Sequence, residues 1–176
     1  MNYIFLDIDG VLNSQDYVLS HIDEDCRIDK SKVKLLAKLV KKYDARIILS
    51  SSWRIRFEDN GEISKSNHSA AVLLKTLFNQ YNIDIFGKTK NGIGNNGKDI
   101  WYYDQGQRAE EIREYINTNL TENDNYIIFD DEDYGKTLKE FGKHFIQTTW
   151  QKGLTEKSIK EAEYVLQKNR GQQETL

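Results

Sequence analysis

Short apolar runs alternate along the chain with longer segments in which apolar residues recur every three or four positions. Five such runs predict buried strands, at residues 3–6, 45–49, 83–86, 126–129 and 144–148. Helical spacing predicts helices at residues 29–43, 69–80, 108–119 and 134–141, and a last helix that Thr155 caps. Apolar strands that alternate with helices are typical of a parallel sheet covered on both faces. We therefore predict a three-layer, Rossmann-like α/β fold with a central parallel sheet of about five strands.

The same pattern predicts where one helix begins and which side chains another helix buries. Asp29 is the expected N-cap of the helix at its position, since its carboxylate can accept a hydrogen bond from a free backbone N–H group. In the helix at residues 69–80, the side chains expected to face the core are Leu73, Leu74, Leu77 and Phe78.

The domain organisation follows from length and from local composition. A chain of 176 residues fits one compact domain. We assign residues 1–168 to a single domain, with a short flap at 14–28 that leaves room for only a minimal cap. A segment rich in Gly and Asn predicts a mobile loop at 87–106, and residues 169–176 form a polar tail.

Charge and cysteine content exclude several classes of function. The chain has 25 basic and 28 acidic residues and a formal charge of −3, so a chain-wide attraction to nucleic acid or to an anionic membrane is not expected. The single cysteine, Cys26, excludes an internal disulfide, and the three dispersed histidines do not form a zinc-site pattern. No apolar stretch has the length of a membrane span or of a signal peptide. We therefore predict a cytoplasmic protein.

Acidic and hydroxyl side chains follow three of the predicted strands. Asp7 and Asp9 come after the first strand, Ser50 after the second, and Asp130 and Asp131 after the fourth. Because the carboxyl ends of parallel strands meet at one edge of the sheet, these side chains should lie close together. Clustered carboxylates repel one another unless a cation neutralises them, and an all-oxygen set suits Mg²⁺.

Such a cluster is chemically suited to phosphoryl transfer. One of Asp7 and Asp9 could attack phosphorus while the other handles protons, because covalent and acid–base roles need separate groups. Ser50 could donate a hydrogen bond to a phosphoryl oxygen, and Arg108 at the start of a helix could offset the charge of the transferring group.

Three motifs occur in an order that resembles a known superfamily. They are D-I-D-G-V-L-N at residues 7–13, I-I-L-S at 47–50 and I-I-F-D-D at 127–131. They resemble the first, second and fourth signatures of the haloacid dehalogenase (HAD) phosphohydrolase superfamily. Together with L-S-S-S-W-R and R-A-E-E-I, they also resemble a narrower group, the HAD domain of Swiss Army knife RNA-repair proteins, which is akin to polynucleotide phosphatases.

The resemblance implies a role for each acidic residue. Asp7 would be the nucleophile that forms an aspartyl-phosphate. Asp9 would protonate the leaving oxygen and later activate water, and its backbone carbonyl would also bind the metal. Ser50 would bind the phosphoryl group. The resemblance further implies that Asp130 ligates Mg²⁺ and that Asp131 does so directly or through water.

The third signature of the superfamily is a cation, and its position in this chain is open. Arg108 stands at the expected place, upstream of the second acidic pair, while Lys88, Lys90 and Lys98 are alternatives. Arginine would balance charge as a planar fork rather than as a point charge.

The phosphate-binding and substrate-binding residues are likewise expectations. Ser50 is favoured over Ser51 and Ser52 because it directly follows the strand, and we assign Ser51, Arg54 and Lys88 to substrate binding. Aromatic and basic side chains could also stack on a nucleic-acid strand, or simply pack in the core: Trp53 with Arg54 and Arg56, and Trp101 with Tyr102 and Tyr103.

The sequence therefore predicts a Mg²⁺-dependent phosphatase, a phosphoric monoester hydrolase that works through an aspartyl-phosphate. A site with a minimal cap would admit a nucleic-acid end, so RNA termini are one candidate substrate. A nucleotide or a sugar phosphate is the alternative. A receiver-like phospho-acceptor domain is disfavoured because Asp7 follows the first strand of the chain. No membrane partner is expected, and the oligomeric state stays open.

Overall fold

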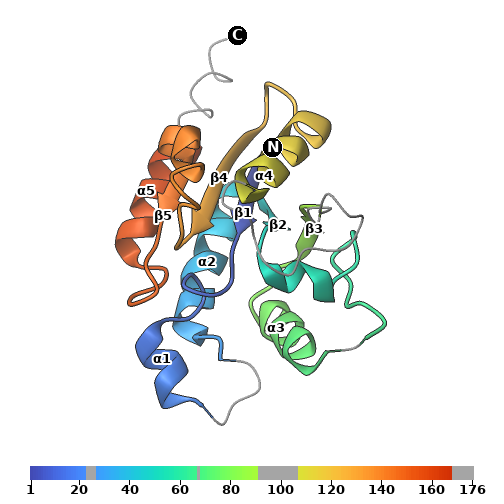
Figure 1. Ribbon diagram of the computed structural model, residues 1–176, viewed down its shortest axis with the longest axis vertical. Coiled ribbons are helices and arrows are strands. Elements are labelled where there is room, and N and C mark those ends of the chain that lie inside the picture. Colours follow the sequence, from blue (N-terminus) through green and yellow to red (C-terminus); the bar gives the residue numbers. More distant parts are fainter. Residues whose placement is uncertain (23–26, 67, 91–106, 168–176) are drawn as a thin grey trace.

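The computed structural model describes residues 1–22, 27–66, 68–90 and 107–167. Its centre is a sheet of five parallel strands in the order β3-β2-β1-β4-β5, which Figure 1 shows from right to left. The strands are β1 (Asn2–Leu6), β2 (Ala45–Leu49), β3 (Ile85–Lys88), β4 (Asn125–Asp130) and β5 (Phe145–Gln147). The structure thus confirms the predicted parallel α/β fold.

Helices cover both faces of the sheet because neighbouring strand residues point to opposite sides. The α-helices are α1 (Gln15–Ser20), α2 (Lys30–Tyr43), α3 (Ser69–Gln80), α4 (Gln107–Asn119) and α5 (Glu156–Gln167). Two 3₁₀ segments are η1 (Ser52–Arg56) and η2 (Leu138–His144). Ile4 and Leu6 pack under α2, α3 and α5, whereas Tyr3 and Phe5 pack under α4 and η2. Within the described residues, no helix has both the length and the apolar character needed to span a bilayer.

The predicted elements match with a few differences. Asp29 caps α2 by accepting a hydrogen bond from the Ser31 N–H group, as expected. The third strand begins at Ile85 rather than at Ile83, because the Ile83 N–H group donates to Phe78 O and closes the end of α3. The helix expected at 134–141 is a 3₁₀ segment that begins later, at Leu138.

One side chain and part of a loop were also wrongly placed. Leu73 is 43% exposed, because α3 buries the stripe formed by Ala70, Ala71, Leu74, Leu77 and Phe78 and Leu73 lies beside it. The loop expected from residue 87 starts later, because Gly87 and Lys88 belong to β3. Residues 91–106, the tail at 169–176 and Cys26 lie outside the described residues.

Hydrogen bonds extend the sheet one residue beyond several strands, and this fixes the backbone of the functional residues. The Asp7 N–H group donates to Phe129 O at 2.9 Å, and the Ser50 N–H group donates to Leu6 O at 3.0 Å. On the other side of β4, the Thr148 N–H group donates to Asp130 O at 2.9 Å. The ends of β1, β2 and β4 are therefore held at one edge of the sheet.

Candidate active site

Three carboxylates meet at this edge. Asp7 follows β1, Asp130 ends β4 and Asp131 comes next, and one oxygen from each lies within 4.8 Å of the others. Asp7 and Asp130 are buried, at 6% and 0% exposure. We call these three side chains the acidic cluster.

Gly10 allows the first loop to approach the acidic cluster closely. Its φ angle is +71°, in the region that glycine tolerates best. A Cβ atom at this position would lie 2.2 Å from Cγ of Asp131. The glycine in the first motif is therefore needed both for the turn and for the contact between the loops after β1 and β4.

One guanidinium group lies against the acidic cluster. Nη1 of Arg108, in the first turn of α4, is 3.3 Å from Oδ1 of Asp7 and 3.6 Å from Oδ2 of Asp130. Its Nη2 donates to the Tyr134 hydroxyl at 3.1 Å, and its side chain is 1% exposed. A buried arginine in this place offsets part of the cluster's negative charge.

The pKa values of the acidic cluster are raised because its members are buried together. Burial raises the pKa of Asp7 well above its usual range, the charge of Asp130 adds to this, and Arg108 opposes it. Burial also raises the pKa of Asp130 to about 7, against the opposing effect of Arg108. The pKa of Asp131 rises to about 6, through burial and then through the nearby Glu132. One guanidinium thus leaves the three carboxylates incompletely neutralised.

The acidic cluster is suited to hold a metal ion. Oδ1 of Asp130 accepts a hydrogen bond from the Glu132 N–H group. The buried Oδ2 accepts none from the described residues, and Nη1 of Arg108 lies 3.6 Å from it, beyond hydrogen-bond distance. A buried carboxylate oxygen without a donor is costly unless a cation binds it. Three carboxylates are also the hard oxygen ligands that Mg²⁺ or Ca²⁺ prefers.

Asp9 has a different environment from Asp7, although only one residue separates them. Its Oδ1 accepts a hydrogen bond from Nδ2 of Asn13, and its Oδ2 accepts one from Nε1 of Trp53, both at 2.9 Å. The Asp9 side chain is not part of the acidic cluster. It is exposed, whereas Asp7 is buried.

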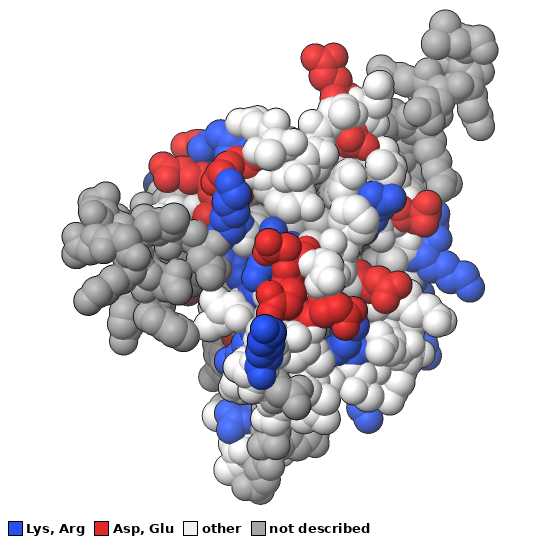
Figure 2. All heavy atoms as spheres, turned by 90° about the vertical axis from the view of Figure 1, so that its right-hand side faces the viewer, with Lys and Arg blue, Asp and Glu red and all other residues white. Residues whose placement is uncertain are grey.

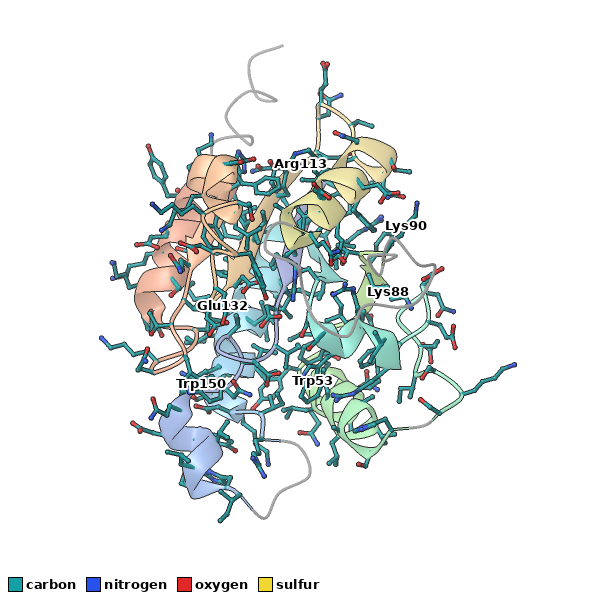
Figure 3. The ribbon with its side chains drawn as sticks, viewed as in Figure 1. Trp53, Lys88, Lys90, Arg113, Glu132 and Trp150 are labelled. Carbon is teal, nitrogen blue, oxygen red and sulfur yellow. The ribbon has the colours of Figure 1, made fainter. Side chains whose placement is uncertain are left out.

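A cavity of about 870 Å³ opens over the acidic cluster. Asp7, Asp9 and Arg108 line it, as do the aromatic side chains of Tyr134 and Trp150. In Figure 3, Trp150, which lines the cavity, lies to the left of Trp53, and Glu132, which also lines the cavity, lies above Trp150. The two aspartates of the first motif therefore face the same open space.

The three serines after β2 have three different environments. Ser50 is fully buried, and its Oγ has no hydrogen-bond partner among the described residues. Oγ of Ser51 accepts a hydrogen bond from the Trp53 N–H group. Ser52 lines the cavity. The structure thus brings Ser52 to the cavity, whereas Ser50 was the expected phosphate ligand.

The cations proposed from the sequence are dispersed. Arg54 is 2% exposed and is held by Glu111, with Nη2 2.8 Å from Oε1, so it braces the core rather than lining the cavity. Lys88 donates to Phe57 O and lines a separate cavity of about 260 Å³ beside α4. Lys90, which is labelled in Figure 3, pairs with Glu114. Lys98 lies outside the described residues.

Sequence reasoning missed the partners of Asp9. The sequence leaves Trp53 open between a stacking surface and a core residue. In the structure its side chain is 9% exposed, and its indole N–H group donates a hydrogen bond to Asp9. Asn13 stands within the first motif, directly after Val11 and Leu12. A polar residue next to these apolar residues was the signal that could have indicated a buried hydrogen-bonding side chain. Trp101, Tyr102 and Tyr103 lie outside the described residues.

The fold and the site define a class of protein: a parallel α/β domain whose strand ends gather carboxylates suited to a metal ion. Residues 3–159 match the family described as the HAD domain in Swiss Army Knife RNA repair proteins. The chain belongs to this family. No curated protein and no solved structure matches the chain.

Proposed function

We propose that this protein is a Mg²⁺-dependent phosphatase that works through an aspartyl-phosphate on Asp7. The contact between Arg108 and Asp7 inside the acidic cluster carries this proposal. A buried carboxylate beside a fixed cation can approach a phosphate dianion that it would otherwise repel. Membership of the HAD superfamily, which is usually phosphohydrolytic, supports the same reaction.

The first step transfers the phosphoryl group to the protein. An oxygen of Asp7 attacks phosphorus, the ester P–O bond breaks, and Asp9 gives a proton to the leaving oxygen. Mg²⁺, held by Asp7, Asp130 and Asp131 with the Asp9 backbone carbonyl as a further ligand, would offset charge on the phosphoryl oxygens. Arg108 does the same from the protein side. Ser50 or Ser52 donates a hydrogen bond to the phosphoryl group.

The second step releases phosphate. Asp9 takes a proton from a water molecule, the water oxygen attacks phosphorus, and the bond from phosphorus to the Asp7 oxygen breaks. The products are inorganic phosphate and the free Asp7 carboxylate. Asp9 is then protonated again and ready for the next ester.

We propose an RNA terminus as the substrate. The family to which the chain belongs occurs in RNA repair proteins. The cavity of about 870 Å³ leaves space beside the phosphate for the nucleoside to which it is attached. Trp150 and Tyr134 line this space and offer aromatic surfaces to a base.

One observation favours a small phosphate ester as the second candidate. Glu132 and Asp133 also line the cavity, and their charges oppose a polyanion. On the face drawn in Figure 2, acidic and basic side chains are intermixed rather than gathered into a basic surface. A mononucleotide or a sugar phosphate would meet less repulsion than a strand.

A substrate panel tests both candidates. Phosphate release is measured with 5′- and 3′-phosphorylated oligoribonucleotides, mononucleotides and sugar phosphates, with Mg²⁺ and with EDTA. Asp7→Asn keeps the size of the side chain and should abolish release. Preference for the oligonucleotides supports repair, preference for mononucleotides supports the second candidate, and activity in Asp7→Asn contradicts the proposed nucleophile.

A further inference from the structure

The Asp9 carboxylate is held at both oxygens by side chains to which the proposed chemistry gives no role. Nδ2 of Asn13 donates to Oδ1 and Nε1 of Trp53 donates to Oδ2, each at 2.9 Å. Two donors from different segments fix the plane of the carboxylate as well as its position.

Trp53 is itself fixed in orientation. It lies in η1, where its backbone N–H group donates to Oγ of Ser51 at 3.2 Å. The guanidinium of Arg56 stacks over its ring, 4.6 Å from the centroid. The Arg54–Glu111 pair braces the same segment from the core side. The indole N–H therefore points to Asp9 without rearrangement.

Asn13 is fixed in the same way. It is 2% exposed, and its Oδ1 accepts a hydrogen bond from the Gly10 N–H group at 2.7 Å. This contact assigns the two ends of the amide, because the oxygen must face Gly10 and the nitrogen must face Asp9. The loop after β1 therefore contains both Asp9, the proposed proton-transfer group, and Asn13, one of the two side chains that orient it.

Two hydrogen bonds leave Asp9 able to carry a proton. A carboxylate oxygen has two lone pairs, and each donor uses one of them. The remaining lone pairs can accept a proton from the cavity side. At the same time, both bonds keep the carboxylate out of the acidic cluster, where a metal ion would compete with protons for it.

We propose that Trp53 and Asn13 are positioning residues that hold the Asp9 carboxylate apart from the metal-binding carboxylates and in place for proton transfer. This inference rests on the proposed phosphatase function. It explains how two aspartates of one short motif can have different roles. The Asp7 carboxylate is next to those of Asp130 and Asp131, whereas the Asp9 carboxylate accepts hydrogen bonds from two neutral donors.

The competing explanation is that Trp53 simply fills the core. The two explanations differ in their dependence on the leaving group. An alkyl alcohol needs a proton to leave, whereas dinitrophenolate leaves without one. Loss of packing would lower kcat/KM for both esters equally. A misplaced proton donor would lower kcat/KM, which reports the transfer to Asp7, only for the alkyl ester, although the later attack of water would be slowed for both.

Trp53→Phe is the main test, because it keeps an aromatic ring and removes the N–H group. We expect kcat/KM for a 5′-nucleotide to fall about 10- to 100-fold, part of the usual contribution of acid–base catalysis. The kcat/KM value for 2,4-dinitrophenyl phosphate should change less than about threefold. Tyr115→Phe removes the hydroxyl group of a ring that does not line the cavity over the acidic cluster, and it should leave both esters unchanged.

A double-mutant cycle shows whether Trp53 acts through Asp9. On the Asp9→Asn background, Trp53→Phe should have no further effect on the 5′-nucleotide. Asn13→Ala removes the other donor without altering aromatic packing, so it decides the question if Trp53→Phe fails to fold. It should show the same split between the two esters.

The outcomes distinguish the positioning role of Trp53 and Asn13 from the proposed phosphatase function. Equal losses on both esters, or independent effects in the double-mutant cycle, would overturn the positioning role while leaving the phosphatase proposal intact. A wild-type protein that hydrolyses neither ester would overturn the proposed function, and the positioning role with it.

Discussion

Replacement of Arg108 by Gln should destabilise the metal-free protein by about 3–5 kcal/mol at pH 8, the usual cost of breaking a buried ion pair. Its Nη1 lies 3.3 Å from Asp7 and 3.6 Å from Asp130. At an effective dielectric constant of about 20, each contact with an ionised carboxylate contributes about 5 kcal/mol. Burial of the guanidinium costs several kcal/mol in return, so the net loss is smaller than the sum.

The loss should depend on pH, and the direction follows from the carboxyl groups. Arg108 lowers the folded-state pKa values of Asp7 and Asp130, which burial raises. Without the arginine these pKa values rise further, while the pKa values in the unfolded chain stay at about 4. A carboxyl whose pKa is raised by folding costs stability as the pH rises from the unfolded towards the folded value. The loss in Arg108→Gln should therefore be smaller at pH 5 than at pH 8.

Urea denaturation at pH 5 and pH 8 in EDTA measures both quantities. Arg113→Gln is the matched control, because Arg113 lies on the same helix and pairs with Glu140 at 2.9 Å. Their side chains are 45% and 63% exposed, so this variant should lose less than about 1 kcal/mol at either pH. A loss for Arg108→Gln below that value at pH 8, or an equal loss at both pH values, would refute the assigned charge balance.

Three further predictions concern the metal site and the cavity. Mg²⁺ should raise the melting temperature more at pH 8 than at pH 5, because protons compete at Asp130 and Asp131, whose pKa values are about 7 and about 6; equal shifts in a thermal scan would contradict this. Gly10→Ala should weaken Mg²⁺ binding about tenfold or more by calorimetry, since its Cβ would collide with Asp131. Gly142→Ala, whose Cβ would have nothing within 4 Å, is the control and should bind normally. Trp150→Ala should raise KM about fivefold or more for phosphorylated oligonucleotides, through lost stacking, and leave KM for glycerol phosphate unchanged in the same phosphate-release assay.

The strands that position the acidic cluster could be predicted because their apolar residues leave little choice. The runs before Asp7, Ser50 and Asp130 are apolar at nearly every position, and such runs must be buried on both faces. The third strand was misplaced because Ile83 is buried for another reason, as part of the turn that closes α3. Apolar character indicates burial, but it does not show which backbone hydrogen bonds a residue makes.

The partners of the site residues could not be predicted in the same way. Arg108, Lys88 and Lys90 carry the same charge, and only the packing of α4 and β3 shows that Arg108 reaches Asp7 while the two lysines do not. Trp53 was undecided for a related reason. An indole can stack, fill space or donate a hydrogen bond, and the choice depends on Asp9, which is 44 residues away in the chain.

The two fully buried arginines differ in the carboxylates beside them, and this difference favours the acidic cluster as the place for a metal ion. Arg54 forms an ion pair with Glu111, so one positive charge offsets one negative charge. Arg108, on the same helix as Glu111, contacts two of the three carboxylates of the acidic cluster, Asp7 and Asp130, and leaves a formal surplus of two negative charges when all three are ionised. A divalent cation cancels that surplus, whereas protons can do so only at a pH below the raised pKa values. The Arg54 pair is already neutral, so Arg54 acts as a structural brace, whereas the acidic cluster retains negative charge that a metal ion could neutralise.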